Sequence, residues 1–313
     1  MIETVTSVKL PVDESLLIQK NRMEPLELTG REKRMTIVTG THGDELEGQF
    51  VCYEVLRRIR ENMDCLKGIV DVFPALNPLG IDSITRGIPQ FDLDMNRIFP
   101  GSEEGVFTEY VAAEVVNDIA GSDLCVDVHA SNIYLREMPQ IRISENTATK
   151  LIPYAKLMNV DFVWVHAAAT VLESTLAHSL NMMGVPTLVV EMGVGMRITK
   201  EYCYQLVDGI FNVMSELGIW TGEVNPVREP YVSVDEEVGF VNADASGIFV
   251  PAVPIWSYVE EGGHIGDILN PLTGLIEHRM EAPCTGTVFT LREYPIVYHG
   301  SLIARVLGGV KIC

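Results

Sequence analysis

Apolar and polar residues alternate with two different periods along the first two thirds of the chain. Short, almost wholly apolar runs predict buried strands at residues 35–38, 68–74, 124–129, 161–165 and 186–190. Amphipathic stretches, whose apolar residues recur at helical spacing, predict helices at residues 45–61, 104–120, 149–158 and 200–217. Strands that alternate with helices in this way are typical of an α/β domain whose sheet is mixed, largely parallel and flanked by helices.

The pattern changes after residue 220. Residues 221–230 are polar, contain prolines and show no period, which indicates a linker. Beyond them, short β-type runs separated by Gly, Pro and Asp lie at residues 247–251, 266–269 and 286–289. This spacing predicts a small all-β barrel or sandwich. We therefore expect an α/β domain at residues 1–220 and a β-rich domain at residues 231–313.

Residues 259–267 resemble part of the barrel-sandwich fold of lipoyl and biotinyl carrier domains. A carrier is modified on a lysine at the tip of a hairpin, and no lysine lies between Lys200 and Lys311. This region therefore cannot carry a lipoyl or biotinyl group, because it lacks the lysine to which that group is attached. A role as a lid, or in the assembly of a homo-oligomer, remains.

Composition narrows the class of protein. The chain has 313 residues, 47% of them hydrophobic, which is enough for a sizeable core. The N-terminus lacks the basic and apolar regions of a signal peptide, and no apolar run could span a bilayer, so we expect a cytoplasmic protein. The six cysteines are scattered and are expected to be reduced. The formal net charge of −20 disfavours nucleic acid and anionic membranes as partners, although a few buried arginines would still let a cleft bind a small anion.

A histidine and a carboxylate lie three residues apart just after the first predicted strand. His42 and Glu45 can converge on one metal ion at this spacing. A catalytic zinc ion usually takes three protein ligands and keeps one position open for water, so a third ligand is expected from elsewhere. The best candidate is His129, which ends the apolar run 124–129. Because ligands gather beyond the carboxyl ends of strands in open α/β sheets, these segments are expected at the same edge.

Other polar side chains follow the predicted strands. Glu191 comes directly after the run 186–190, and because a buried strand normally excludes an unpaired carboxylate, it is a candidate general base. Asn96 and Arg97 offer donors suited to a carboxylate or an oxyanion. Asp94 either fixes the tautomer of a ligand histidine or caps a turn. Asp127 has the same two alternatives, a contact to a ligand or the stabilisation of a loop.

Together these segments carry a family resemblance. The same motifs occur, in the same order, in the zinc carboxypeptidase-like clan: His42-x-x-Glu45, Asp94-Met95-Asn96-Arg97, Asp127-x-His129 and Val190-Glu191. Within that clan the chain resembles the succinylglutamate desuccinylase/aspartoacylase family. The resemblance covers roughly the first two thirds of the chain as a catalytic domain, and the remainder resembles the β-rich appendage that those enzymes carry.

The resemblance implies a zinc-dependent amidohydrolase that removes the acyl group from an N-acyl amino acid or a related small amide. His42, Glu45 and His129 would bind one zinc ion per chain, and Glu191 would activate the zinc-bound water.

It also implies how the substrate is held. Asn96 and Arg97 would bind the substrate carboxylate, and Arg86 resembles the arginine that polarises the scissile carbonyl.

Two other functions compete with that of an amidohydrolase. A carboxypeptidase would use the same apparatus on peptide C-termini, and a non-catalytic protein would carry a relic of it. Retention of every expected ligand and of Glu191 argues against the relic. A serine hydrolase or a nucleotide enzyme would need a Gly-x-Ser-x-Gly elbow or a phosphate-binding glycine loop, and neither is present. Tyr134, Arg136 and Arg142 follow His129 and either reach the substrate or lie in a solvated loop, of which the loop is the commoner outcome.

Overall fold

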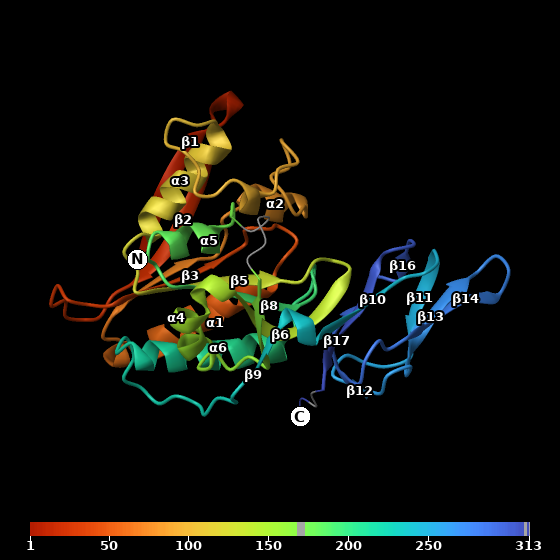
Figure 1. Ribbon diagram of the computed structural model, residues 1–313. Coiled ribbons are helices and arrows are strands. Elements are labelled where there is room, and N and C mark those ends of the chain that lie inside the picture. Colours follow the sequence, from red (N-terminus) through yellow and green to blue (C-terminus); the bar gives the residue numbers. More distant parts are fainter. Residues whose placement is uncertain (168–172, 310–311, 313) are drawn as a thin grey trace.

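The computed structural model describes residues 1–167, 173–309 and 312. Among these residues, one mixed sheet has 13 strands in the order β1-β2-β4-β3-β5-β8-β6-β15-β17-β10, with β7, β9 and β12 paired beside this path. The strands that lie before residue 221 are β1 (Ile2–Lys9), β2 (Ser15–Met23), β3 (Arg34–Thr39), β4 (Ile69–Phe73), β5 (Leu124–Ala130), β6 (Leu135–Ser144), β7 (Phe162–His166) and β8 (Thr187–Gly193), and β9 (Tyr231–Val234) follows the segment 221–230. Figure 1 shows one part of the sheet among helices and another in the C-terminal region, drawn in blue.

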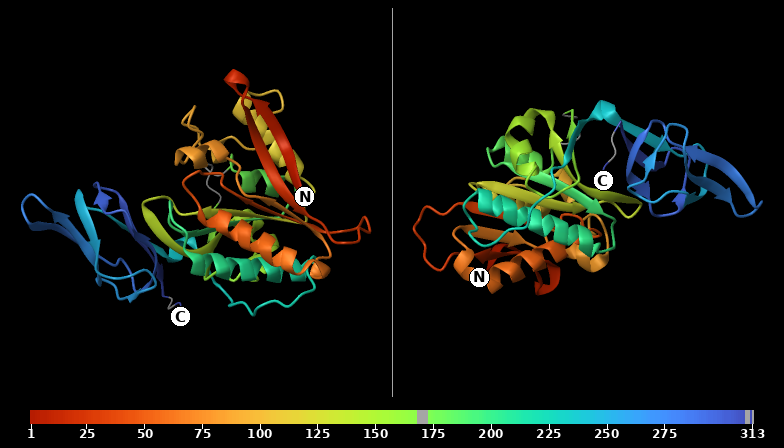
Figure 2. Two further views of the ribbon diagram at one scale, coloured as in Figure 1. Left: turned by 180° about the vertical axis from the view of Figure 1, so that it is seen from behind. Right: turned by 90° about the horizontal axis from the view of Figure 1, so that it is seen from below.

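Helices cover both faces of the first part of the sheet. They are α1 (Glu47–Glu61), α2 (Pro78–Ser83), α3 (Phe107–Ile119), α4 (Ala148–Ala155), α5 (Leu176–Met182) and α6 (Lys200–Glu216). Figure 2 shows α1 and α6 side by side on one face, whereas α3 lies on the other face with the hairpin β1–β2. No helix in the described part of the chain is long and apolar enough to cross a membrane.

Each face of the sheet has its own apolar core. In β3, Met35 and Ile37 belong to the core that includes α1 and α6, whereas Val38 belongs to the core that includes α3 and α5. In β5, Val126 and Cys125 divide between the two cores in the same way. Strands that are buried on both faces have continuous apolar sequences, which is why these strands are visible in the sequence.

Three neighbouring parallel strands end at one edge of the sheet. β5 pairs in parallel with β3 on one side and with β8 on the other. The register places Val38 beside Asp127, and His129 beside Glu191. The strand ends that carry the candidate site residues therefore meet, as expected for an α/β sheet.

The C-terminal region follows the irregular segment 221–230. Its first strand, β9, pairs in parallel with β7. The others are β10 (Val238–Asn242), β11 (Gly247–Pro251), β12 (Tyr258–Val259), β13 (His264–Asn270), β14 (Leu275–Glu281), β15 (Gly286–Arg292), β16 (Ile296–Val297) and β17 (Leu302–Gly308). A second sheet has the order β14-β13-β11-β16. An apolar core that includes Phe249, Ile268 and Val306 joins this sheet to the C-terminal strands of the large one.

Backbone pairing of β15 with β6 connects the two parts of the large sheet. The register places Thr290 beside Glu137 of β6 on one side. On the other side, Thr290 lies beside Arg305 of β17. The C-terminal strands thus continue the large sheet, while the division of the chain into domains stays a prediction.

One segment differs from the sequence prediction. The sequence predicts a solvated loop that contains Arg136 and Arg142, and this is wrong, because both residues lie in β6 within the large sheet. β6 also carries the buried residues Glu137 and Gln140, so it lacks the apolar run that marks the neighbouring strands. An ion pair between Arg142 and Glu137 compensates the burial of charge in this strand.

Candidate active site

His42 and Glu45 lie in the tight connection between β3 and α1. This connection packs directly against the backbone of α2. A Cβ atom on Gly43 would lie 2.0 Å from the backbone carbonyl carbon of Gly80, so a glycine is required at this close approach. The packing holds His42 and Glu45 at the carboxyl end of β3, next to the end of β5.

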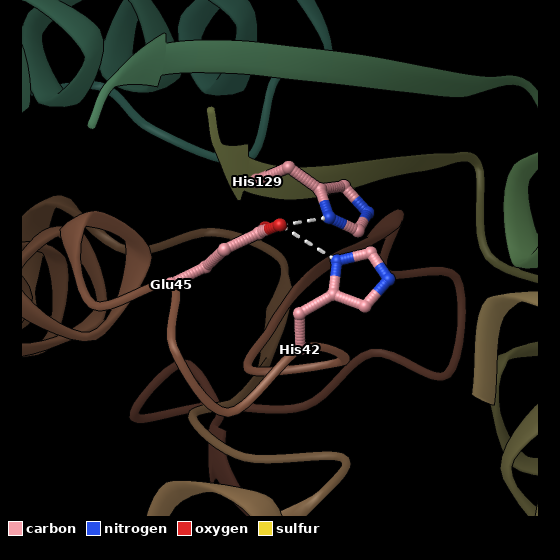
Figure 3. Close-up of side chains that lie close together, drawn as sticks. All are labelled: His42, Glu45 and His129. Carbon is pink, nitrogen blue, oxygen red and sulfur yellow. Dashed lines mark hydrogen bonds and ion pairs between the residues drawn. The ribbon is translucent and has the colours of Figure 1, made fainter. Parts of the chain in front are cut away.

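Three ligand-type side chains converge at this edge (Figure 3). His42 Nδ1 lies 2.8 Å from Glu45 Oε1, and His129 Nδ1 lies 3.0 Å from Glu45 Oε2. All three side chains are buried, and one ligand atom from each lies within 4.8 Å of the others. The group could therefore hold a metal ion. Two imidazole nitrogens and a carboxylate oxygen form a donor set that is common at catalytic zinc sites.

The electrostatics of this group favour positive charge at its centre. Burial opposes the ionisation of Glu45, but His42 and His129 outweigh burial and hold the Glu45 pKa well below its usual range. Burial also opposes the charged form of His129, yet Asp127 and Glu45 raise the His129 pKa well above its usual value. A divalent cation bound by neutral imidazoles would supply the positive charge that these carboxylates favour.

Two aspartates contact the outer nitrogens of the two histidines. Asp94 Oδ1 lies 3.0 Å from His42 Nε2, and Asp127 Oδ1 lies 3.2 Å from His129 Nε2. Asp94 also accepts a hydrogen bond from the backbone nitrogen of Asn96 at 2.9 Å, so it caps a turn as well. A carboxylate that holds the Nε2 proton leaves Nδ1 unprotonated and able to bind a metal ion.

The convergent side chains border a cavity of about 570 Å³. Its lining includes most of the residues that the sequence analysis singled out: His42, Glu45, Arg86, Asn96, Arg97, Asp127, His129 and Glu191. Tyr134 and Arg142, which the sequence places in a solvated loop, line it too. A cavity of this size, with several charged and polar side chains in its lining, suits a small molecule such as an amino-acid derivative.

Arg86, Asn96 and Arg97 bring hydrogen-bond donors to the cavity. Arg86 Nη1 donates to Glu45 Oε1 at 3.0 Å. Asn96 Oδ1 accepts a hydrogen bond from the backbone nitrogen of Leu176 at 2.9 Å, and Arg97 Nη1 donates to the backbone oxygen of Asn96 at 2.7 Å. Within the described ranges, the Asn96 amide nitrogen and Arg97 Nη2 make no hydrogen bond to protein, so both can serve a ligand.

Glu191 also faces the cavity, from β8. Burial raises the pKa of its carboxyl group, and Arg142 opposes that shift. Arg142 Nη1 donates to Glu191 Oε1 at 3.3 Å. The sequence interpretation named Arg142 but favoured a solvated loop for it, and it missed Glu137 and Arg305, which line the same cavity. No local motif could reveal them, because Arg305 comes from β17 at the far end of the chain.

Comparison with known proteins shows the family to which the chain belongs. A family model described as the succinylglutamate desuccinylase/aspartoacylase catalytic domain matches residues 31–217. A curated relative, the N-alpha-acetyl-L-2,4-diaminobutyric acid deacetylase of Halomonas elongata, is 25% identical over 320 residues, which cover 96% of this chain and 90% of the relative.

Solved structures share the fold along almost the whole chain. A succinylglutamate desuccinylase/aspartoacylase from Rhodobacter sphaeroides has a TM-score of 0.80 at 21% identity and covers 96% of this chain and 92% of its own. The product-bound ectoine utilization protein of Ruegeria pomeroyi has a TM-score of 0.81 at 20% identity, with the same shares covered, 96% and 92%. At this identity the likeness establishes the fold.

Proposed function

Because the chain belongs to the succinylglutamate desuccinylase/aspartoacylase family, we propose that it hydrolyses the amide bond of an N-acyl amino acid or a related small amide, with one zinc ion per chain. The observation that carries this proposal is the convergence of His42, Glu45 and His129 beside a cavity that also contains Glu191. A candidate metal-ligand group (His42, Glu45 and His129) next to a separate, half-buried carboxylate is the arrangement that metal-assisted hydrolysis needs.

His42, Glu45 and His129 would hold the zinc ion through the two Nδ1 atoms and the carboxylate. When bound, zinc lowers the pKa of the attacking water and polarises the amide carbonyl. Asp94 would keep the proton of His42 on Nε2 through its hydrogen bond, and the charge of Asp127, 3.2 Å from His129 Nε2, would favour the same tautomer there.

Glu191 would be the general base. It would take a proton from the attacking water and deliver it to the leaving amine. Burial, which raises its pKa, suits both steps, because a carboxyl group whose pKa lies closer to neutrality accepts and returns a proton more readily.

The substrate would be oriented by Asn96, Arg97 and Arg86. The free donors of Asn96 and Arg97 suit the planar carboxylate of an acyl amino acid. Arg86, which already contacts Glu45, would polarise the scissile carbonyl and stabilise the oxyanion that forms from it.

The substrate range can be tested directly. The deacetylase relative supports the acetyl group as the first acyl group to examine. A carboxypeptidase would use the same residues on peptide C-termini, so N-acetyl and N-succinyl amino acids should be compared with short peptides. We expect the zinc-loaded protein to hydrolyse N-acyl amino acids in preference to peptides.

The matched control is Glu191→Gln, which keeps the shape of the side chain and removes the base. It should retain zinc and lose on the order of 10²-fold or more in turnover. Near-normal turnover in this variant would remove Glu191 from the mechanism. Failure of the zinc-loaded wild type to hydrolyse any N-acyl amino acid would refute the proposed function.

A further inference from the structure

A network of two arginines and two glutamates connects the C-terminal strands to Glu191. Arg142 Nη2 donates to both carboxylate oxygens of Glu137, at 3.0 and 2.9 Å. Arg142 Nη1 donates to Glu191 Oε1 at 3.3 Å, and Arg305 Nη1 donates to Glu137 Oε1 at 2.5 Å. Two positive and two negative charges therefore balance within the network. Glu137 is only 1% exposed, so this compensation is what makes its burial tolerable.

The network depends on strand pairing between distant parts of the chain. Glu137 and Arg142 lie in β6, Glu191 lies in the neighbouring β8, and Arg305 lies in β17. Thr290 of β15 stands between Glu137 and Arg305 in the sheet register and donates its hydroxyl to Glu137 at 3.3 Å. The C-terminal strands thus supply a cation to the cavity of the α/β part.

An aromatic ring supports both arginines. The guanidinium carbons of Arg142 and Arg305 lie 5.8 and 5.4 Å from the ring centroid of Trp164. The indole nitrogen of Trp164 donates to Asp235 at 2.7 Å, which fixes the plane of the ring. A guanidinium held against an aromatic face and bound to a carboxylate has few other orientations. Arg142 is therefore held firmly at the place where it meets Glu191.

We propose that Arg142 is a positioning residue that holds the Glu191 carboxylate in place for proton transfer, and that Arg305 fixes Arg142 through Glu137. Both terminal nitrogens of Arg142 donate to carboxylates of the protein, and these two contacts are the ones that we assign to positioning. The inference rests on the proposed role of Glu191 as the base. It gives the C-terminal region a part in the chemical step.

Variants at the two ends of the network test the positioning role. Arg142→Gln should lower kcat about 30-fold, and Arg305→Gln about 10-fold, with KM changed less than about threefold in each. Arg305→Lys keeps a cation next to Glu137 and should restore most of the loss. The matched control is Arg136→Gln, which removes an ion pair of 3.1 Å to Glu293 across the same β6–β15 junction and should leave kcat unchanged.

A second comparison separates positioning from a general structural role. In the Glu191→Gln background no carboxylate remains to be positioned, so adding Arg142→Gln should lower kcat less than about threefold further. Equal losses in the two backgrounds would overturn the proposal. A rise in KM in place of the fall in kcat would also overturn it, because Arg142 would then bind the substrate.

Crystal structures of the zinc-loaded wild type and Arg305→Gln give a result that does not depend on activity. We expect the contact between Arg142 and Glu191 to lengthen in the variant and the Glu191 carboxylate to be displaced. If the wild type hydrolyses no N-acyl amino acid, the proposed function fails, whereas a displaced carboxylate would still support the network. An unmoved Glu191 carboxylate would overturn it. Arg305→Gln also keeps the test open if Arg142→Gln fails to fold.

Discussion

Two polar clusters share one cavity and are built in opposite ways. The candidate metal-ligand group takes His42 and Glu45 from one turn and His129 from the end of an adjacent strand. The charge network takes Glu137 and Arg142 from β6 and Arg305 from β17, two strands that both pair with β15. Carboxylate charge in the first cluster would be balanced by a bound cation, whereas in the second the chain itself supplies the cations. A site with local ligands leaves a motif in the sequence, and a site made by distant strand pairing leaves none.

The two clusters should therefore respond differently to the loss of one member. A zinc site loses its ion when a ligand is removed, so its response is close to all or none. A positioning network weakens by degrees, because each arginine retains another partner. The predictions below test this difference, beginning with the largest effect.

The largest effect is expected at the metal-ligand group. His42→Ala and His129→Ala should each abolish stoichiometric zinc binding and lower kcat/KM by at least about 10³-fold. Metal analysis of the purified variants by mass spectrometry is the measurement. His264→Ala, in β13 of the C-terminal region, is the control and should bind zinc normally. Stoichiometric zinc in both cavity variants would show that the ligands lie elsewhere.

A smaller effect is expected where the cavity meets the substrate. Arg97→Lys keeps the charge but loses the planar fork, so KM for an N-acyl amino acid should rise about tenfold while zinc content stays unchanged. Amidation of the substrate carboxylate should then penalise the wild type far more than the variant. Equal penalties in the two proteins would show that Arg97 does not bind that carboxylate. This result would separate substrate recognition from both clusters.

The smallest effect is expected at Thr290, which lies between Glu137 and Arg305 in the sheet. Thr290→Val keeps the shape of the side chain but removes the hydroxyl that donates to Glu137, so kcat should fall about threefold and the free energy of unfolding by about 1 kcal/mol. Thr285→Val is the control, because Thr285 accepts a hydrogen bond from the backbone nitrogen of Glu261 outside the network. It should lower stability by a similar amount without changing kcat. The same kcat in both variants would argue against a graded network.

The sequence was most informative where function lies next to a buried strand. His42, His129 and Glu191 each follow or end an apolar run, and the structure brings all three to the same edge of the sheet. Their roles in metal binding and proton transfer stay predictions. Their proximity could be predicted from the sequence, because the carboxyl ends of parallel strands lie at the same edge of a sheet.

β6 could not be predicted from the sequence, and the reason lies in its buried charges. Glu137 and Arg142 interrupt the apolar period, so the strand looks like a solvated loop until its partners are known. Those partners include Arg305, whose position depends on the pairing of β15 with both β6 and β17. Burial of a charge depends on its compensation, and compensation from a remote strand cannot be inferred from local sequence.

The pairing of β15 with β6 also protects an edge. Without β15, the backbone groups of residues 135–137 that face Thr290 and its neighbours would lose their ladder partners. An uncovered strand edge is a template on which another chain can add a strand. A chain shortened before β15 would therefore expose an unpaired strand edge next to its cavity. By covering this edge, the C-terminal strands protect the α/β part against aggregation.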